Sequence, residues 1–180
     1  MLKGKAIHLR TVRESDLEDL YDVLCDIENR GNYDTLGILS EPIFKKDFRD
    51  GGFWQENRGT MLILNKENSI IGSISFFKSI PYFNGFEIGF VIHNPKDRGK
   101  GYTTEATNIF VAYLFETKEI NRLQATTLLE NTPSIRVLEK CGFTFEGKAR
   151  GAIFHKGEYK DAHVYSLLRN ESKKLEDLLK

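Results

Sequence analysis

The chain is poor in cysteine and proline and has no excess of charge of either sign. Its 180 residues include two cysteines, four prolines, 26 lysines and arginines, and 26 aspartates and glutamates. Cys25 and Cys141 lie far apart and outside any Cys-x-x-Cys motif, so we expect neither a disulfide framework nor a zinc ribbon, and we expect a reducing, cytoplasmic location. Because a binder of duplex nucleic acid usually carries a basic excess, no nucleic-acid partner is expected.

Long apolar runs are also missing. No stretch approaches the roughly 18 to 20 apolar residues that span a bilayer, and the opening MLKGKAIHLR lacks the apolar segment of a secretory leader. We therefore expect no membrane partner. No linker or internal repeat interrupts the chain, which predicts a single domain over residues 1–170 and a charged C-terminal tail over 171–180 that forms a short helix.

The hydropathy pattern predicts an α/β fold. Strands are expected at 6–11, 61–64, 70–77, 86–93, 122–128, 143–155 and 158–168, and helices at 13–28, 43–57, 103–117 and 132–142. Thr11 and Glu14 have the spacing of a capping box that would begin the first helix, and Lys156-Gly157 suits a tight hairpin turn. This order of elements predicts a central, twisted mixed sheet with helices on both faces.

The most informative stretch is EIGFVIHNPKDRGKGYTTEA, over residues 87–106. A strand is followed by a turn with two glycines and two basic residues, and then by a strongly patterned helix. Inward-pointing N–H groups and the helix N-terminus attract an anion, glycine allows its close approach, and Arg98 and Lys100 add charge. We interpret the turn as a phosphate or pyrophosphate cradle.

The turn has three other possible interpretations. A Walker phosphate loop needs Ser or Thr after Gly-Lys, where this chain has Gly101. A dinucleotide-binding fingerprint needs Gly or Ala at the position of Thr104. The glycines could also serve only the entry into the helix. Gly101 and Thr104 therefore count against both of the nucleotide motifs.

The turn resembles that of a known family. Residues 98–103, RGKGYT, are similar to the Arg-x-x-Gly-x-(Gly/Ala) motif of the GNAT acetyl-CoA-dependent N-acetyltransferases, with Thr103 at the last position. RGKGYTTEA looks most like the RimJ/RimL branch, the ribosomal-protein N-terminal acetyltransferase type. Residues 131–143, NTPSIRVLEKCGF, resemble the second cofactor segment of the family, and residues 9–17 and 157–169 resemble its opening strand and helix and its closing hairpin.

The resemblance implies a GNAT-like fold and transfer of an acetyl group from acetyl-CoA to a primary amine. The amine would be a protein N-terminal α-amine or a small molecule, attacked directly in a ternary complex, and the enzyme a monomer or homodimer. In the family, the strand before the turn splays from the next parallel strand and pairs with the pantetheine arm. Cofactor contacts would then fall on Phe90, Val91, Ile92, Arg98, Gly99, Lys100, Gly101, Tyr102, Thr103 and Asn131.

The same resemblance suggests catalytic groups. The family's oxyanion donor, a backbone N–H at a strand bulge, falls near Val91. Leu138 stands where many members have a tyrosine acid, so Ser134 is the expected substitute, unless it only caps its helix. Glu87 is the expected base, because residues 87, 89 and 91 share one strand face. Further candidates for the base are His93, Glu130 and Glu146.

Other functions stay open at this point. Leu138, in place of the tyrosine, also permits a catalytically silent acyl-CoA-binding module or sensor, and the turn permits a nucleotide-binding protein. No metal is expected, since a two-residue turn pairs His155 with residue 158 and not with His163. Cys141 is expected to pack in the core. Four aromatic residues are expected either to line the acceptor pocket or to belong to the core: Phe53, Trp54, Tyr82 and Phe83.

Overall fold

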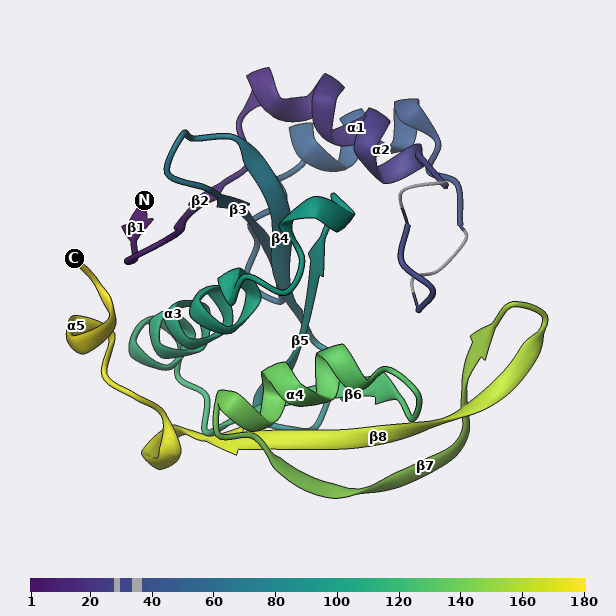
Figure 1. Cartoon of the computed structure of the whole chain (residues 1–180), viewed down its shortest axis with the longest axis vertical. Helices are drawn as coiled ribbons and strands as arrows, with labels where there is room; N and C mark the ends of the chain where they lie inside the picture. The colour runs from purple at the N-terminus through teal and green to yellow at the C-terminus, as the bar shows by residue number, and fades with distance from the viewer. Residues whose placement is uncertain (28–29, 34–36) are drawn as a thin grey trace.

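The computed structural model describes residues 1–27, 30–33 and 37–180. Its eight strands form one sheet in the order β1-β2-β3-β4-β5-β6-β8-β7 (Figure 1). They are Leu2–Lys3 (β1), His8–Thr11 (β2), Arg58–Leu64 (β3), Ile70–Phe77 (β4), Gly85–Ile92 (β5), Arg122–Leu128 (β6), Thr144–His155 (β7) and Glu158–Leu168 (β8). β5 and β6 are parallel and the other neighbours are antiparallel, so the predicted mixed sheet is confirmed.

Helices cover both faces of this sheet, as predicted. They are Leu17–Cys25 (α1), Glu41–Arg49 (α2), Tyr102–Thr117 (α3), Thr132–Lys140 (α4) and Leu175–Leu178 (α5). α1 and α2 lie on one side, and α3 and α4 on the other (Figure 1). Alternation along β3 explains both cores, because successive side chains point to opposite faces. Leu62 and Leu64 pack with α1 and α2, whereas Met61 and Ile63 pack with α3.

α3 is the central helix, with eight buried residues among its sixteen. Its last turn is held by Arg169, which follows β8. The guanidinium donates hydrogen bonds to the carbonyls of Phe115, Lys118 and Ile120. A cation at this end satisfies carbonyls that have no partner within the helix and complements the helix dipole. Among the described helices, none is long and apolar enough to cross a membrane.

The beginning of the first helix was predicted wrongly. Thr11 belongs to β2 and does not cap a helix over 13–28, whose residue 28 lies outside the described residues. The carboxylate of Asp16 takes that role instead. It accepts hydrogen bonds from the Arg13 N–H at 2.7 Å and from two nitrogens of Arg10 at 2.6 and 2.8 Å. This buried carboxylate therefore joins β2 to the start of α1.

The end of the second helix was also predicted wrongly, whereas the hairpin turn follows its local signal. The second helix ends at Arg49 and not at residue 57, because Gly52 adopts a φ of 60° beyond it. The Lys156-Gly157 turn is confirmed, with φ values of 49° and 85°. The 171–180 tail contains α5, and the N–H of Leu175 donates to the Glu116 carboxylate at 3.0 Å. The tail therefore packs against α3.

Candidate active site

β5 and β6 pair over a short distance and then separate. Their parallel register begins at Gly85 with Arg122 and ends at Glu87 with Gln124, although β5, which is fully described, continues to Ile92. The far halves of the two strands therefore leave backbone donors and acceptors without a sheet partner. Buried backbone groups need hydrogen bonds. An extended ligand that enters this gap can pair with the strand edge, as in strand addition.

The backbone of Phe90 and Ile92 faces the gap. The β4–β5 register has no shift, and beyond it the His93 N–H donates to the Ile71 carbonyl at 3.0 Å. Residues of an antiparallel strand alternate between those bonded to the partner and those turned away. The Val91 N–H thus points to β4. The bulge expected near Val91 is not present in β4 and β5, which are both fully described. The amides that face the gap belong to the residues on either side of Val91, namely Phe90 and Ile92.

Two glycines shape the turn after β5. Gly99 has a φ of 75° and Gly101 a φ of 83°, a conformation that other residues rarely adopt. Both are exposed, and a Cβ built on either would meet nothing within 4 Å. Gly101 caps α3, since its carbonyl accepts the Glu105 N–H at 3.1 Å. The first-turn N–H groups, including those of Tyr102 and Thr103, have no partner within the helix and carry its partial positive charge.

The two basic residues of the turn have different surroundings. Arg98 donates from Nε and Nη2 to the Ile92 carbonyl at 3.3 and 3.2 Å, which ties the turn to the end of β5. Lys100 Nζ lies 3.2 Å from the Asp97 carboxylate and 5.9 Å from the centre of the Tyr102 ring. Its side chain is 49% exposed. Arg98 therefore shapes the cradle, and both basic side chains are exposed at the turn, where an anion can reach them.

Asn131 and Ser134 lie at the start of α4. Oδ1 of Asn131 accepts the Ser134 N–H at 3.2 Å, so the asparagine is the N-cap. α3 follows β5 and α4 follows β6, and both helices therefore begin at the carboxyl edge of the parallel pair. This places both helix N-termini at the edge of the sheet where the gap opens. Because the side-chain oxygen Oδ1 of Asn131 caps the helix, the Nδ2 group of the same side chain is left for a ligand.

The face of β5 that is turned away from α3 carries Glu87, Gly89 and Val91. We call it the acceptor face. Glu87 is half-buried, and Gln124 Nε2 donates to its Oε2 at 3.5 Å. A Cβ added to Gly89 would meet only the Ser75 hydroxyl, at 3.7 Å. Neither backbone strain nor crowding by the chain therefore explains this glycine. It leaves open space beside the Glu87 carboxylate.

Two other candidate groups are unsuited to proton transfer or attack. Arg122 lies 2.5 Å from the Glu146 carboxylate, and its hydrogen bonds, together with one from Ser166, hold the pKa of Glu146 below its ordinary value. Glu146 is therefore a poor base. Burial raises the pKa of the Cys141 thiol to about 12, and its Sγ donates to the Thr104 carbonyl at 3.5 Å. Cys141 is a core residue.

The predicted aromatic residues fall into two groups. Trp54 packs against three aromatic rings of the α3 core, and Phe53 packs against two rings of α2. Tyr82 and Phe83 are exposed in the loop before β5, at the end remote from the gap. None of the four therefore lines the gap. His155 pairs with Glu158, and the described residues hold no group of three or more metal-ligating side chains.

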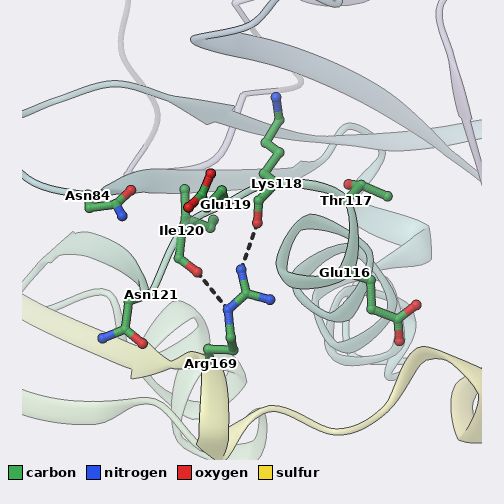
Figure 2. A pocket seen from close by; sticks show the side chains of 8 residues that line it. All are labelled: Asn84, Glu116, Thr117, Lys118, Glu119, Ile120, Asn121 and Arg169. Atoms are coloured by element: carbon green, nitrogen blue, oxygen red, sulfur yellow. Dashed lines mark hydrogen bonds between the residues drawn. The ribbon is translucent and has the colours of Figure 1, made fainter.

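A surface depression of about 500 Å³ lies at the other end of β5 and β6 (Figure 2). It is lined by Asn84, Arg169 and residues 116–121. Figure 2 shows the Arg169 guanidinium directed at the carbonyls of Lys118 and Ile120. The depression surrounds the last turn of α3 and the contacts that hold it. It is thus a structural junction, remote from the gap, the turn and the α4 N-cap.

The fold is that of an acetyltransferase, and the chain belongs to the GNAT acetyltransferase family. The model of the acetyltransferase (GNAT) domain matches residues 6–144. The uncharacterised N-acetyltransferase YnaD of Bacillus subtilis is 32% identical over 174 residues, covering 93% of this chain and 96% of the relative. The ribosomal-protein-serine acetyltransferase of Escherichia coli is 25% identical, and the match covers 91% of this chain and 93% of the relative. The chain is therefore an acetyltransferase.

A solved structure supports the fold. The spermidine N-acetyltransferase of Vibrio cholerae, in complex with CoA and spermine, superposes with a TM-score of 0.76. It is 19% identical, and the match covers 92% of this chain and 96% of that one. At this identity the likeness concerns the fold, and the predicted GNAT architecture is confirmed.

Proposed function

We propose that this enzyme transfers the acetyl group of acetyl-CoA to a primary amine by direct attack in a ternary complex. The observation that carries the proposal is the gap between β5 and β6, which opens at the left-handed glycines and the N-terminus of α3. The gap offers backbone hydrogen bonds to an amide-containing arm, and the turn offers N–H groups to a diphosphate. The Vibrio cholerae protein of the same fold was solved with CoA.

In this proposal the cofactor contacts follow the direction of each group. The Ile92 N–H and the Phe90 carbonyl face the gap and pair with the pantetheine arm, and Val91 adds its side chain on the acceptor face. Nδ2 of Asn131 reaches the arm from the start of α4. The diphosphate lies against the remaining residues of the cradle: Arg98, Gly99, Lys100, Gly101, Tyr102 and Thr103.

The proposed chemistry divides into three tasks. Glu87 accepts the proton that the ammonium loses, directly or through a water, which frees the nitrogen to attack the thioester carbon. A gap-facing N–H, that of Phe90, stabilises the oxyanion that forms. As the carbon–sulfur bond breaks, Ser134 gives its proton to the thiolate and regains one from solvent, while the attacking nitrogen releases its second proton to solvent and becomes the amide nitrogen. The buried, weakly acidic Cys141 argues against a covalent acyl-enzyme.

We infer that the acceptor is the α-amine of a protein N-terminus. The sequence similarity to the ribosomal-protein-serine acetyltransferase of Escherichia coli, over 91% of this chain, favours that acceptor class. A small-molecule amine such as a polyamine is the second candidate, favoured by the fold shared with the Vibrio cholerae enzyme. The open space at Gly89 is compatible with an amine of either kind.

A mass-spectrometric transfer assay tests the function. Acetyl-CoA is offered with peptides that begin with Ser, Ala or Thr, and with polyamines, amino acids and aminoglycosides. We expect the Ser-initiated peptide to be acetylated. In parallel, calorimetry should show that Gly101→Glu raises the Kd for CoA by about 5- to 1000-fold, because a carboxylate near the diphosphate adds about 1–4 kcal/mol of repulsion.

Gly101→Asn is the matched control, since Asn tolerates the left-handed conformation without adding charge. It should retain much of the CoA affinity. Tight CoA binding with no product from any amine would favour the silent acyl-CoA-binding module. Failure of the wild-type chain to bind CoA, or a normal affinity in Gly101→Glu, would overturn the proposed function.

A further inference from the structure

A chain of polar side chains crosses the acceptor face from the closing hairpin to Glu87. The Ser166 hydroxyl donates to Glu146 at 2.6 Å, and Arg122 donates to both oxygens of Glu146 at 2.5 Å. Nη2 of Arg122 also donates to Oε1 of Gln124 at 3.0 Å. Nε2 of Gln124 then donates to Glu87 at 3.5 Å. The chain joins four strands, β7, β8, β6 and β5.

This network determines the direction of Gln124. A side-chain amide has one end that only accepts and one that only donates. The Arg122 guanidinium requires the accepting end, so the donating end is left for Glu87. Arg122 itself is held by Glu146, and that pairing raises the pKa of Arg122 and lowers that of Glu146. Both partners are therefore charged at neutral pH.

Gln124 also occupies a special place in the sheet. Glu87 and Gln124 are the last paired position of β5 and β6 before the strands separate, and Ser166 is the partner of Gln124 on β8. The amide thus bridges the two strands at the point where the gap begins. Its 3.5 Å contact is long for a hydrogen bond, but catalytic contacts in free enzymes often shorten when substrate binds.

We propose that Gln124 is a positioning residue for acetyl transfer, which holds the Glu87 carboxylate toward the acceptor amine while Arg122 and Glu146 hold Gln124. The inference rests on the proposed role of Glu87. A neutral amide between the carboxylate and the guanidinium orients Glu87 without forming an ion pair with it. An ion pair with Arg122 would occupy the lone pairs that receive the proton of the amine.

A double-mutant cycle tests the proposal, with CoA release measured for a Ser-initiated peptide and for spermidine. Glu87→Gln and Gln124→Met should each lower kcat, the second by about tenfold, while KM for acetyl-CoA stays within about twofold. The double variant should be no slower than Glu87→Gln, because Gln124 acts through Glu87. Thr60→Val, a half-buried position on β3, is the control and should change neither constant.

Gln124→Glu separates positioning from a merely structural role. It keeps an acceptor for Arg122, which preserves the network, but it cannot donate to Glu87. We expect kcat at least as low as in Gln124→Met. A wild-type kcat in Gln124→Glu, or effects that multiply in the double variant, would overturn the proposal.

The outcomes distinguish this inference from the proposed function. An unchanged kcat in Glu87→Gln would refute the role of Glu87, whereas a slow Glu87→Gln with normal Gln124 variants would refute only the positioning role. If neither acceptor is used, the cycle is measured on the equilibrium constant of unfolding in urea. A coupling of at least about threefold is expected between residues 87 and 124, and none between 87 and 60. Equal couplings for the pair 87 and 124 and for the pair 87 and 60 would overturn the proposal.

Discussion

At the scale of single residues, the proposed mechanism gives Ser134 the task of protonating the leaving thiolate. Leu138, the position of the expected tyrosine, is 1% exposed and packed in the core with Cys141. It brings no polar group to the gap. The hydroxyl of Ser134 is not needed for the helix cap, because its N–H, and not its side chain, binds Asn131. A change at Ser134 should therefore affect chemistry more than structure.

We predict that Ser134→Ala lowers kcat by about 10- to 100-fold and leaves the Kd for CoA within about twofold. Single-turnover kinetics measures the chemical step, and calorimetry measures the affinity. Thr132→Ala, an exposed hydroxyl in the same turn of α4, is the control and should leave both values unchanged. An undiminished single-turnover rate in Ser134→Ala would remove this residue from the mechanism.

At the scale of elements, one carboxylate holds the junction between β2 and α1. Asp16 is 7% exposed, and hydrogen bonds from Arg10 first, and from the Arg13 backbone, lower its pKa. A carboxyl whose pKa is lowered in the folded state stabilises it above its unfolded pKa, roughly 3.9. That stability is lost as the pH falls through the lower, folded value. The junction should therefore weaken in acid.

We predict that Asp16→Asn lowers the free energy of unfolding at pH 7 by about 1–3 kcal/mol, because Arg10 loses its charged partner. The loss should shrink as the pH falls below about 4, where the wild-type carboxyl is protonated too. Urea titrations at several pH values measure this. Asp22→Asn, on the exposed side of α1, is the control. An equal loss at every pH would contradict the prediction.

At the scale of the whole molecule, the short pairing of β5 and β6 joins the two halves of the sheet. β1 to β5 carry one half, and β6, β8 and β7 the other (Figure 1). A cofactor in the gap would add hydrogen bonds exactly where that pairing stops. Ligand binding stabilises the state that binds it, by about 2.7 kcal/mol at 100 times Kd.

Amide hydrogen exchange can read this closure residue by residue. We predict that saturating acetyl-CoA slows exchange at Phe90 and Ile92 by at least about tenfold, because the Ile92 N–H gains the pantetheine arm and the Phe90 N–H gains the thioester oxygen as partners. Exchange at Val91, whose N–H already faces β4, should change far less. NMR exchange on the full chain measures all three, with Val164 in the middle of β8 as the control. Selective slowing at Val91 would contradict the assigned strand direction.

Much of the sheet could be predicted because turn residues and hydrophobic alternation lie within each strand and its flanks. The bounds of β4 and β6 match those predicted, since turn residues and alternation mark both ends. The start of α1 failed because its cap is Asp16, held by Arg10 from a neighbouring strand. The predicted bulge near Val91 failed for a similar reason, because register depends on the partner strand β4.

The glycine turn could be predicted from the sequence, because the left-handed conformations of Gly99 and Gly101 and the start of α3 depend on neighbouring residues. The gap and the network at its mouth could not, because they depend on tertiary contacts. Gln124 lies 37 residues from Glu87, and Arg122 lies 24 residues from Glu146. Such contacts arise from strand order and register, which long-range packing sets and no local pattern records.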